Sequence, residues 1–102
     1  MRKTYARAIP QPWRHTASLF TALGDPHRQR ILLMFEPDER LTVSQIAAAS
    51  TLSRTAVVHH LKVLREAGAL RAQKVGKEVW YETQPDAVRA ALGAVLDYLR
   101  DM

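Results

Sequence analysis

The feature that most constrains the fold is a pair of helical patterns separated by only three residues. Thr42 and Gln45 have the spacing of a capping box, which predicts that a short helix begins there. Ser53 is a favourable N-cap for a second helix, and the apolar periodicity of that helix continues until Gly68 stops it. Residues 50–52 are left to form a tight turn. Two helices joined this closely predict a helix-turn-helix unit.

Further helices are predicted on both sides of this unit. Apolar residues recur at spacings of three and four over residues 13–23, which indicates a first amphipathic helix. Asp25 followed by Pro26 is a strong helix start, so we expect a second helix from there to about Phe35. Pro85 begins a last helix with an apolar stripe along one side.

A β-hairpin is predicted between the helix-turn-helix unit and the last helix. Residues 70–75 and 78–83 are strand-like, and only Gly76 and Lys77 separate them. Glycine in the first of two loop positions suits a type II′ turn. The sequence thus predicts a mainly α fold with a small β-hairpin, in the order α-α-α-α-β-β-α, which is a winged helix-turn-helix.

Length and charge suggest one domain with an anionic partner. A chain of 102 residues fits a single domain, which we expect over residues 13–102, and the basic residues 1–12 read as an N-terminal arm. Fifteen Lys and Arg against ten Asp and Glu give a formal charge of +5, which favours nucleic acid. No apolar stretch approaches the roughly 18 residues that cross a bilayer, so we expect a cytoplasmic protein without a membrane partner.

The second helix of the pair has one face suited to a DNA groove. Arg54 can pair with a guanine edge, and Val58 offers methyl groups to thymine, although an isolated exposed valine is the plainer alternative. Lys77, at the hairpin tip, can reach a flanking phosphate or the minor groove, or can simply be a polar turn residue. His60 has inward-facing neighbours, so we expect a packed, hydrogen-bonded histidine. The predicted DNA-binding residues are Ser53, Arg54, Thr55, Val58, His59, Lys62, Arg65, Lys74 and Lys77.

Three segments resemble the ArsR family of bacterial repressors. These are LFTALGDPHRQRILLMF at residues 19–35, LSRTAVVHHLKVLREAGAL at residues 52–70, and the hairpin VGKEVWYET at residues 75–83. The resemblance implies a winged helix-turn-helix repressor that occupies a promoter. It also implies a symmetric dimer formed by the first and last helices.

The last helix supports a dimer independently of the resemblance. It is more apolar along one side than a lone terminal helix of a small domain should be, unless that side packs only on its own core. A dimer with two reading helices one turn apart would match a near-palindromic duplex. The predicted interface residues are Trp13, Ala17, Phe20, Val88, Leu92, Val95, Leu96 and Leu99.

The family's metal sites are not predicted here. The chain has no cysteine, and the last helix carries Asp86, Asp97 and Asp101 without a histidine. We expect no metal or other cofactor and no enzymatic activity, because no glycine-rich phosphate loop or catalytic set is present. Three alternatives stay open: a winged helix that contacts only proteins, an activator, and regulation by an organic effector that the sequence does not name.

Overall fold

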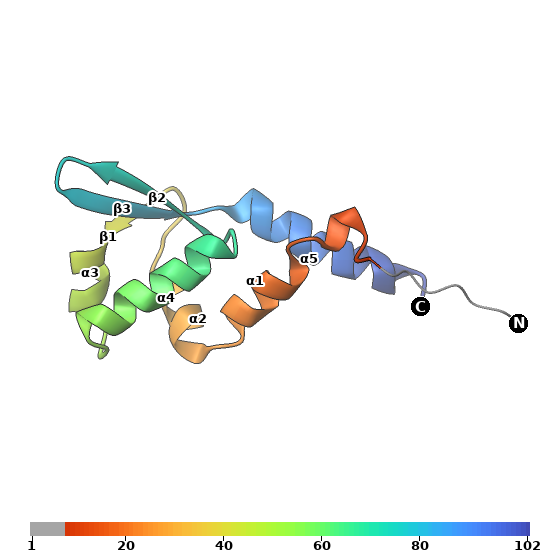
Figure 1. Ribbon diagram of the computed structural model, residues 1–102, viewed down its shortest axis with the longest axis horizontal. Helices are drawn as coiled ribbons and strands as arrows, with labels where there is room; N and C mark the ends of the chain where they lie inside the picture. Colours follow the sequence, from red (N-terminus) through yellow and green to blue (C-terminus); the bar gives the residue numbers. More distant parts are fainter. Residues whose placement is uncertain (1–7) are drawn as a thin grey trace, which may run out of the picture.

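The computed structural model describes residues 8–102 and shows one winged-helix body from which the last helix projects (Figure 1). Residues 1–7, most of the predicted basic arm, lie outside the described residues. The elements, in chain order, are η1 (Gln11–Trp13, a 3-10 turn), α1 (Thr16–Leu23), α2 (Pro26–Leu32), β1 (Arg40–Thr42), α3 (Val43–Ala48), α4 (Arg54–Glu66), β2 (Leu70–Val75), β3 (Glu78–Thr83) and α5 (Pro85–Arg100).

The predicted helix caps are confirmed. The Asp25 carboxylate accepts hydrogen bonds from the first free backbone amides of α2, the shorter being 2.8 Å from His27 N. Thr42 and Gln45 form the reciprocal capping box of α3, at 3.2 and 2.9 Å. Ser53 Oγ accepts a hydrogen bond of 3.2 Å from the first turn of α4. Each cap satisfies amides that a helix start leaves without a partner.

Two predicted helix boundaries were wrong. The first helix does not start at Trp13, because residues 11–13 form the separate turn η1, and α1 begins at Thr16. This turn places the Trp13 ring edge-on against Tyr98 of α5, with centroids 5.9 Å apart, a long-range contact that overrides the local helical pattern. The second helix ends at Leu32 instead of Phe35. After it the chain tightens, because Met34 N and Phe35 N donate to carbonyl oxygens three residues back, those of Ile31 and Leu32, instead of four.

The wing is larger than the predicted hairpin. β2 and β3 pair antiparallel with Val75 opposite Glu78, and Gly76 has a φ of +62°, as a type II′ turn requires at its first loop position. β1 adds a third strand, in the order β1-β3-β2, with Leu41 opposite Tyr81. The sequence prediction missed β1, because three residues are too few to show a period-2 pattern.

Helix α4 is fixed by the core on one side only. Its Val57, Leu61 and Leu64 side chains are fully buried. They pack in one cluster with residues from α1, α2, α3 and the wing, which are Leu19, Ile31, Ile46 and Leu70 among the largest. Elements α1, α2, α3 and the wing thus hold α4 in place, while its opposite face is turned outward.

Helix α5 is anchored at its start and stands apart at its end. Val88, Ala91 and Leu92 pack on the core, whereas Leu96 and Leu99 are 65% and 51% exposed. Figure 1 shows α5 and η1 extending beyond the body, and the molecule measures 59 × 23 × 22 Å along its principal axes. Between residues 8 and 102, no helix has the length and hydropathy that crossing a bilayer requires.

Candidate nucleic-acid interface

The outward face of α4 gathers the predicted DNA-reading side chains. Val58, 45% exposed, lies among cations and hydrogen-bonding groups, so a methyl surface and polar groups are presented together. A major groove offers complements to both, in base-edge acceptors and thymine methyl groups. Ser53 is the N-cap of α4, and its hydroxyl is engaged by the first helical turn. The exposed residues that form this reading face are Arg54, Thr55, Val58, His59, Lys62 and Arg65.

Arg54 is oriented by a contact that the sequence did not reveal. Its Nη1 donates a hydrogen bond of 3.1 Å to Ser44 Oγ, at the start of α3. One bond uses one of the five guanidinium N–H donors, so the planar fork keeps enough donors for a bidentate pair with a guanine. Ser44 therefore belongs to the site as a positioning residue. Its position inside the capping box, between Thr42 and Gln45, carried no signal of that role.

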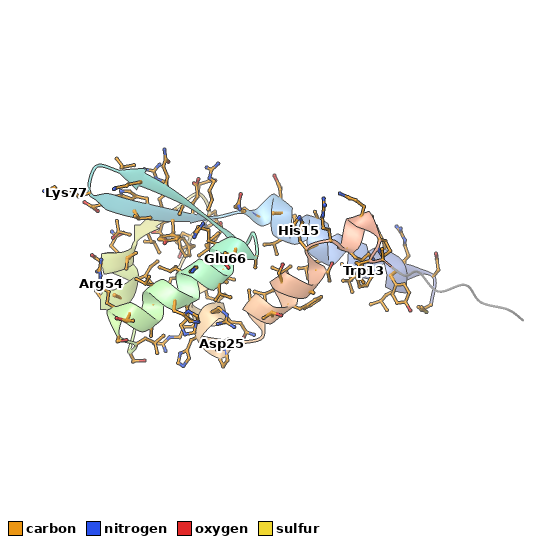
Figure 2. All side chains as sticks on the ribbon, in the orientation of Figure 1. Trp13, His15, Asp25, Arg54, Glu66 and Lys77 are labelled. Atoms are coloured by element: carbon orange, nitrogen blue, oxygen red, sulfur yellow. The ribbon has the colours of Figure 1, made fainter. Side chains whose placement is uncertain are left out.

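The wing carries free positive charge at its tip, whereas an ion pair neutralises a cation near its base. Figure 2 shows Lys77 at the outer end of the hairpin, on the same side of the molecule as Arg54. Lys74 is exposed on β2. Arg71, near the base of the hairpin, is paired with Glu82 across the two strands. The cationic groups that remain for phosphates are therefore concentrated toward the tip.

Arg40 is a further wing cation, which the sequence prediction missed. Its guanidinium carbon lies 5.5 Å from the ring centroid of Trp80, and its Nη1 donates a hydrogen bond of 3.4 Å to Gln73. A guanidinium over an indole ring is held in a defined place while it stays in contact with solvent. Arg40 lies on the edge strand β1, so it was hidden for the same reason as that strand.

An arginine behind the reading face joins α1, α2 and α4. Arg28 donates hydrogen bonds to the carbonyl oxygens of Ala22 (2.8 Å) and Thr21 (3.2 Å), and its Nη1 lies 3.1 Å from His60 Nδ1. Arginine has only donors, so Nδ1 must accept, and the neutral His60 ring carries its proton on Nε2. The predicted packed, hydrogen-bonded histidine at position 60 is confirmed. This contact spans 32 residues of sequence.

The surroundings of His60 favour its neutral form. Desolvation by burial lowers the pKa of His60 below its ordinary value. The carboxylate of Asp25 opposes this change, while the positive charges of Arg28, His59 and His27 add to it. A proton on Nδ1 would also break the hydrogen bond from Arg28. The neutral ring is thus part of the packing behind α4.

We expect the free energy of unfolding to fall as the pH drops below about 6.5. As the pH falls, His60 is protonated in the unfolded chain at a higher pH than in the folded chain. The stabilising contribution is therefore fully present above the pKa of the unfolded chain. It decreases as the pH falls from that pKa to the lower pKa of the folded chain. One proton limits the slope to about 1.4 kcal/mol per pH unit. Urea unfolding between pH 5 and 8 should show this loss, and His60→Gln should reduce it. If His59→Gln, at an exposed neighbour, reduced it equally, the assignment to His60 would be wrong.

The terminal helices expose a second, apolar set of side chains. We call the exposed residues Phe20, Leu96, Tyr98 and Leu99 the terminal-helix surface; Phe20 is 47% exposed. Of the other predicted interface residues, Ala17 is exposed and Trp13 is half-buried against Tyr98. Val88 and Leu92 are half-buried against the protomer's own core, and Val95 is half-buried too. The inner half of the predicted α5 stripe is thus already partly used within the protomer.

Among residues 8–102, no three His, Asp or Glu side chains gather closely enough to bind a metal ion. Three histidine rings lie in a row, and the ring centroid of His60 is 5.8 Å from those of both His27 and His59. The Nδ1 of His60 is occupied by Arg28.

A helix pair with an outward cationic face, together with a three-stranded wing, defines a winged helix-turn-helix protein. A helix-turn-helix domain family matches residues 23–73. The chain belongs to the ArsR family of winged helix-turn-helix transcriptional regulators.

Individual relatives agree with this assignment. A Transcriptional repressor SmtB homolog of Synechocystis is 34% identical over 83% of this chain, and the chain spans 64% of that protein's length. An ArsR-like transcriptional regulator from Rhodococcus superposes with a TM-score of 0.77 at 26% identity, covering 85% of this chain and 81% of that one. The homodimeric winged helix-turn-helix DNA-binding domain Mb0332 of Mycobacterium bovis gives a TM-score of 0.67 at 25% identity, covering 85% and 79%.

Proposed function

We propose that the protein is a homodimeric, sequence-specific DNA-binding repressor that acts in the cytoplasm by occupying near-palindromic promoter sites. The observation that carries this proposal is the reading face of α4. Arg54, Thr55 and Val58 stand exposed on a helix whose opposite side is fully buried. A helix can enter the major groove with only its outward face in contact with the bases.

The lower part of the reading face suits phosphate contacts. Lys62 lies 3.9 Å from Glu66, but both side chains are more than half exposed, so this ion pair contributes little and is easily exchanged for a phosphate. Arg65 is exposed about two turns further along α4 than Val58 and His59. Together with Lys74 and Lys77, these cations can fix the protein on the duplex while Arg54 and its neighbours discriminate bases.

The two-fold symmetry of a dimer would fix the spacing of the half-sites. We assign the subunit contact to η1, α1 and α5, because the terminal-helix surface is apolar and residues 8–102 leave it about half exposed or more. The Mycobacterium neighbour is described as homodimeric, which supports the assignment. Two reading faces about 34 to 36 Å apart would meet successive major grooves on one side of the duplex. Such a protein works by occupancy and needs no catalytic group.

The proposed function is tested by selecting genomic fragments on the purified protein and measuring their affinity by fluorescence anisotropy. We expect one short near-palindrome to be enriched and bound roughly a thousandfold or more tighter than scrambled duplex. Transcription from the selected promoter in vitro should decrease when the protein is added. An increase would assign activation instead. Failure to bind any duplex at low salt would leave the fold with a different use, such as contact with another protein.

Lys77→Ala should weaken binding to all sequences alike, because a contact to phosphate carries no base information. The slope of log K against log salt should become shallower by about one. Arg89→Ala, which removes one exposed charge from α5 where Arg89 pairs with Asp86, is the matched control and should leave the slope unchanged. A loss at Lys77 that depends on the base sequence would show that the wing tip reads bases.

A further inference from the structure

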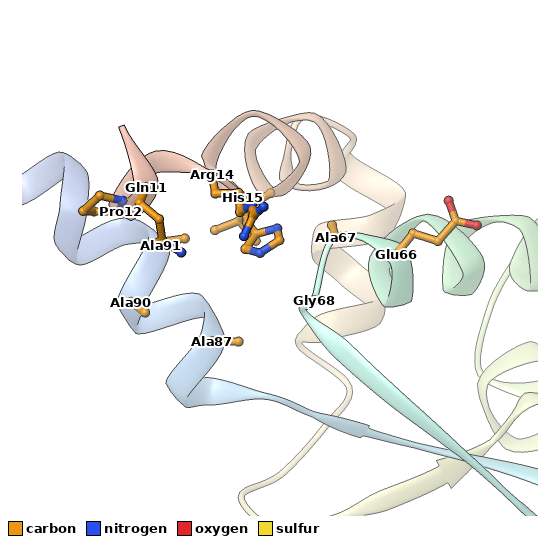
Figure 3. A pocket seen from close by; sticks show the side chains of 11 residues that line it. Gln11, Pro12, Arg14, His15, Glu66, Ala67, Gly68, Ala87, Ala90 and Ala91 are labelled. Carbon is orange, nitrogen blue, oxygen red and sulfur yellow. The ribbon is translucent and has the colours of Figure 1, made fainter. Parts of the chain in front are cut away.

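A cavity of about 500 Å³ lies where three elements meet, and the proposed DNA contacts make no use of it. Its walls come from the η1–α1 junction, from the C-terminal end of α4 and from the first half of α5 (Figure 3). The volume falls within the roughly 300 to 1,000 Å³ that is usual for sites of small organic ligands. The cavity is therefore large enough for a two-ring molecule.

One wall of the cavity is apolar and remains open because its side chains are small. Ala67 ends α4, and Ala87, Ala90 and Ala91 come from successive turns of α5. A methyl group on each of these residues cannot fill the space between the helices, and Leu19 of α1 adds a buried apolar contact. A flat hydrocarbon body would bury apolar surface of its own and of this wall on entering.

The opposite side of the cavity carries positive charge. Arg14 and His15 enter it from the break between η1 and α1, and Figure 3 shows the His15 ring facing the space beside α4 and α5. His15 is the N-cap residue of α1 but makes no capping bond through its side chain, so the helix start does not hold the ring. Gln11 adds an amide beside them.

The single acid among the described lining residues does not cancel this charge. The Glu66 carboxylate is 3.9 Å from Lys62 Nζ on the outer side of α4. Figure 3 shows it directed away from His15. Arg14 stays charged at any physiological pH, so the side of the cavity beside the η1–α1 junction carries a positive charge that Glu66 faces away from.

We propose that this cavity binds a small organic anion, a carboxylate attached to a flat apolar body. The carboxylate would accept charge-assisted hydrogen bonds from Arg14 and His15, while the apolar body would lie against the alanine wall of α4 and α5. An uncharged or cationic analogue of the same shape would lack these bonds and bind less tightly.

The position of the cavity links such a ligand to DNA binding, a step that rests on the proposed function. The cavity wall includes the end of α4, whose outward face reads DNA, and α5, which carries the terminal-helix surface. A molecule bound between α4 and α5 favours one orientation of α4 relative to α5, and so relative to the proposed subunit contact. A ligand that prefers one arrangement must change DNA affinity, and DNA must change the ligand's affinity by the same factor.

The binding test uses 1-naphthoate, with 1-naphthalenemethanol as the uncharged match and 1-naphthylmethylamine as the cationic match, in titration calorimetry without DNA. We expect naphthoate to bind at least about tenfold tighter than either analogue, and Arg14→Gln to remove that preference. Ala90→Leu should abolish binding by filling the cavity. Arg30→Gln and Ala48→Leu make the same changes at exposed positions outside the cavity and should bind naphthoate normally.

Three results would overturn the proposal. They are equal binding of the three probes, normal naphthoate binding by Ala90→Leu, and an Ala90→Leu protein that loses its dimer, which would assign the cavity to the subunit contact.

The effect on DNA binding is measured next: saturating naphthoate should shift the affinity for the selected duplex by roughly fivefold or more. Naphthoate binding without any DNA binding would refute the proposed function alone. DNA binding that naphthoate leaves unchanged would refute the regulatory role of the cavity.

Discussion

The double variant Leu96→Glu, Leu99→Glu is expected to be a folded monomer that binds the selected duplex roughly 100-fold or more weakly than the parent protein. Both leucines are more than half exposed in the protomer, so the carboxylates cost the protomer little. In a dimer the same carboxylates would be buried against the partner without a counter-charge, which is strongly unfavourable. Once the subunits separate, the second half-site is no longer bound at high effective concentration.

Sedimentation velocity at micromolar concentration measures the first effect and fluorescence anisotropy the second. The matched control is Leu33→Glu, the same change at a leucine that is 86% exposed in the turn after α2. It should leave both the dimer and the DNA affinity intact. A double variant that stays dimeric would move the subunit contact away from α5. Thermal melting checks that both variants remain folded.

Arg54→Ala is expected to weaken binding to the selected site by about 1 to 3 kcal/mol while leaving scrambled duplex nearly unchanged. The reason is that a bidentate contact with guanine is lost only where that guanine is present. Arg54 is exposed and its hydrogen bond to Ser44 is at the surface, so the substitution should leave the fold intact. Anisotropy titrations against a set of single-base variants of the site would locate the base that Arg54 reads.

Two control variants separate reading from positioning at this site. Ser44→Ala removes only the hydroxyl that accepts from Arg54 Nη1, so it should weaken binding less than Arg54→Ala and at the same base position. Arg54→Lys keeps the charge but loses the planar fork, so it should retain binding to scrambled duplex and lose base discrimination. Equal losses on every duplex would make Arg54 a phosphate contact.

The sequence predicted the features that depend on neighbouring residues. The caps at Asp25, Thr42 and Ser53 were readable because donor and acceptor lie within three residues of each other. The type II′ turn was readable because it needs glycine at one position, and Gly76 supplies it. The outward placement of the α4 side chains followed from helical periodicity once the inward side was known.

Features formed by distant segments could not be predicted in this way. The hydrogen bonds that Arg28 makes to Thr21, Ala22 and His60 depend on how three helices pack, and no local sequence pattern predicts them. The turn η1 replaced a predicted helix start because Trp13 meets Tyr98, 85 positions further along the chain. The cavity follows the same rule, since its alanines and the Arg14 and His15 side chains come from segments that only the fold brings together.

The two indole rings of the chain give it a built-in pair of optical reporters. Trp13 lies on η1 beside the terminal-helix surface, and Trp80 lies in the wing beneath Arg40. Emission from the first should respond when subunits associate, and emission from the second when the wing approaches a phosphate backbone. With Trp13→Phe and Trp80→Phe proteins, assembly and duplex contact can be timed separately in one cuvette without attaching a dye.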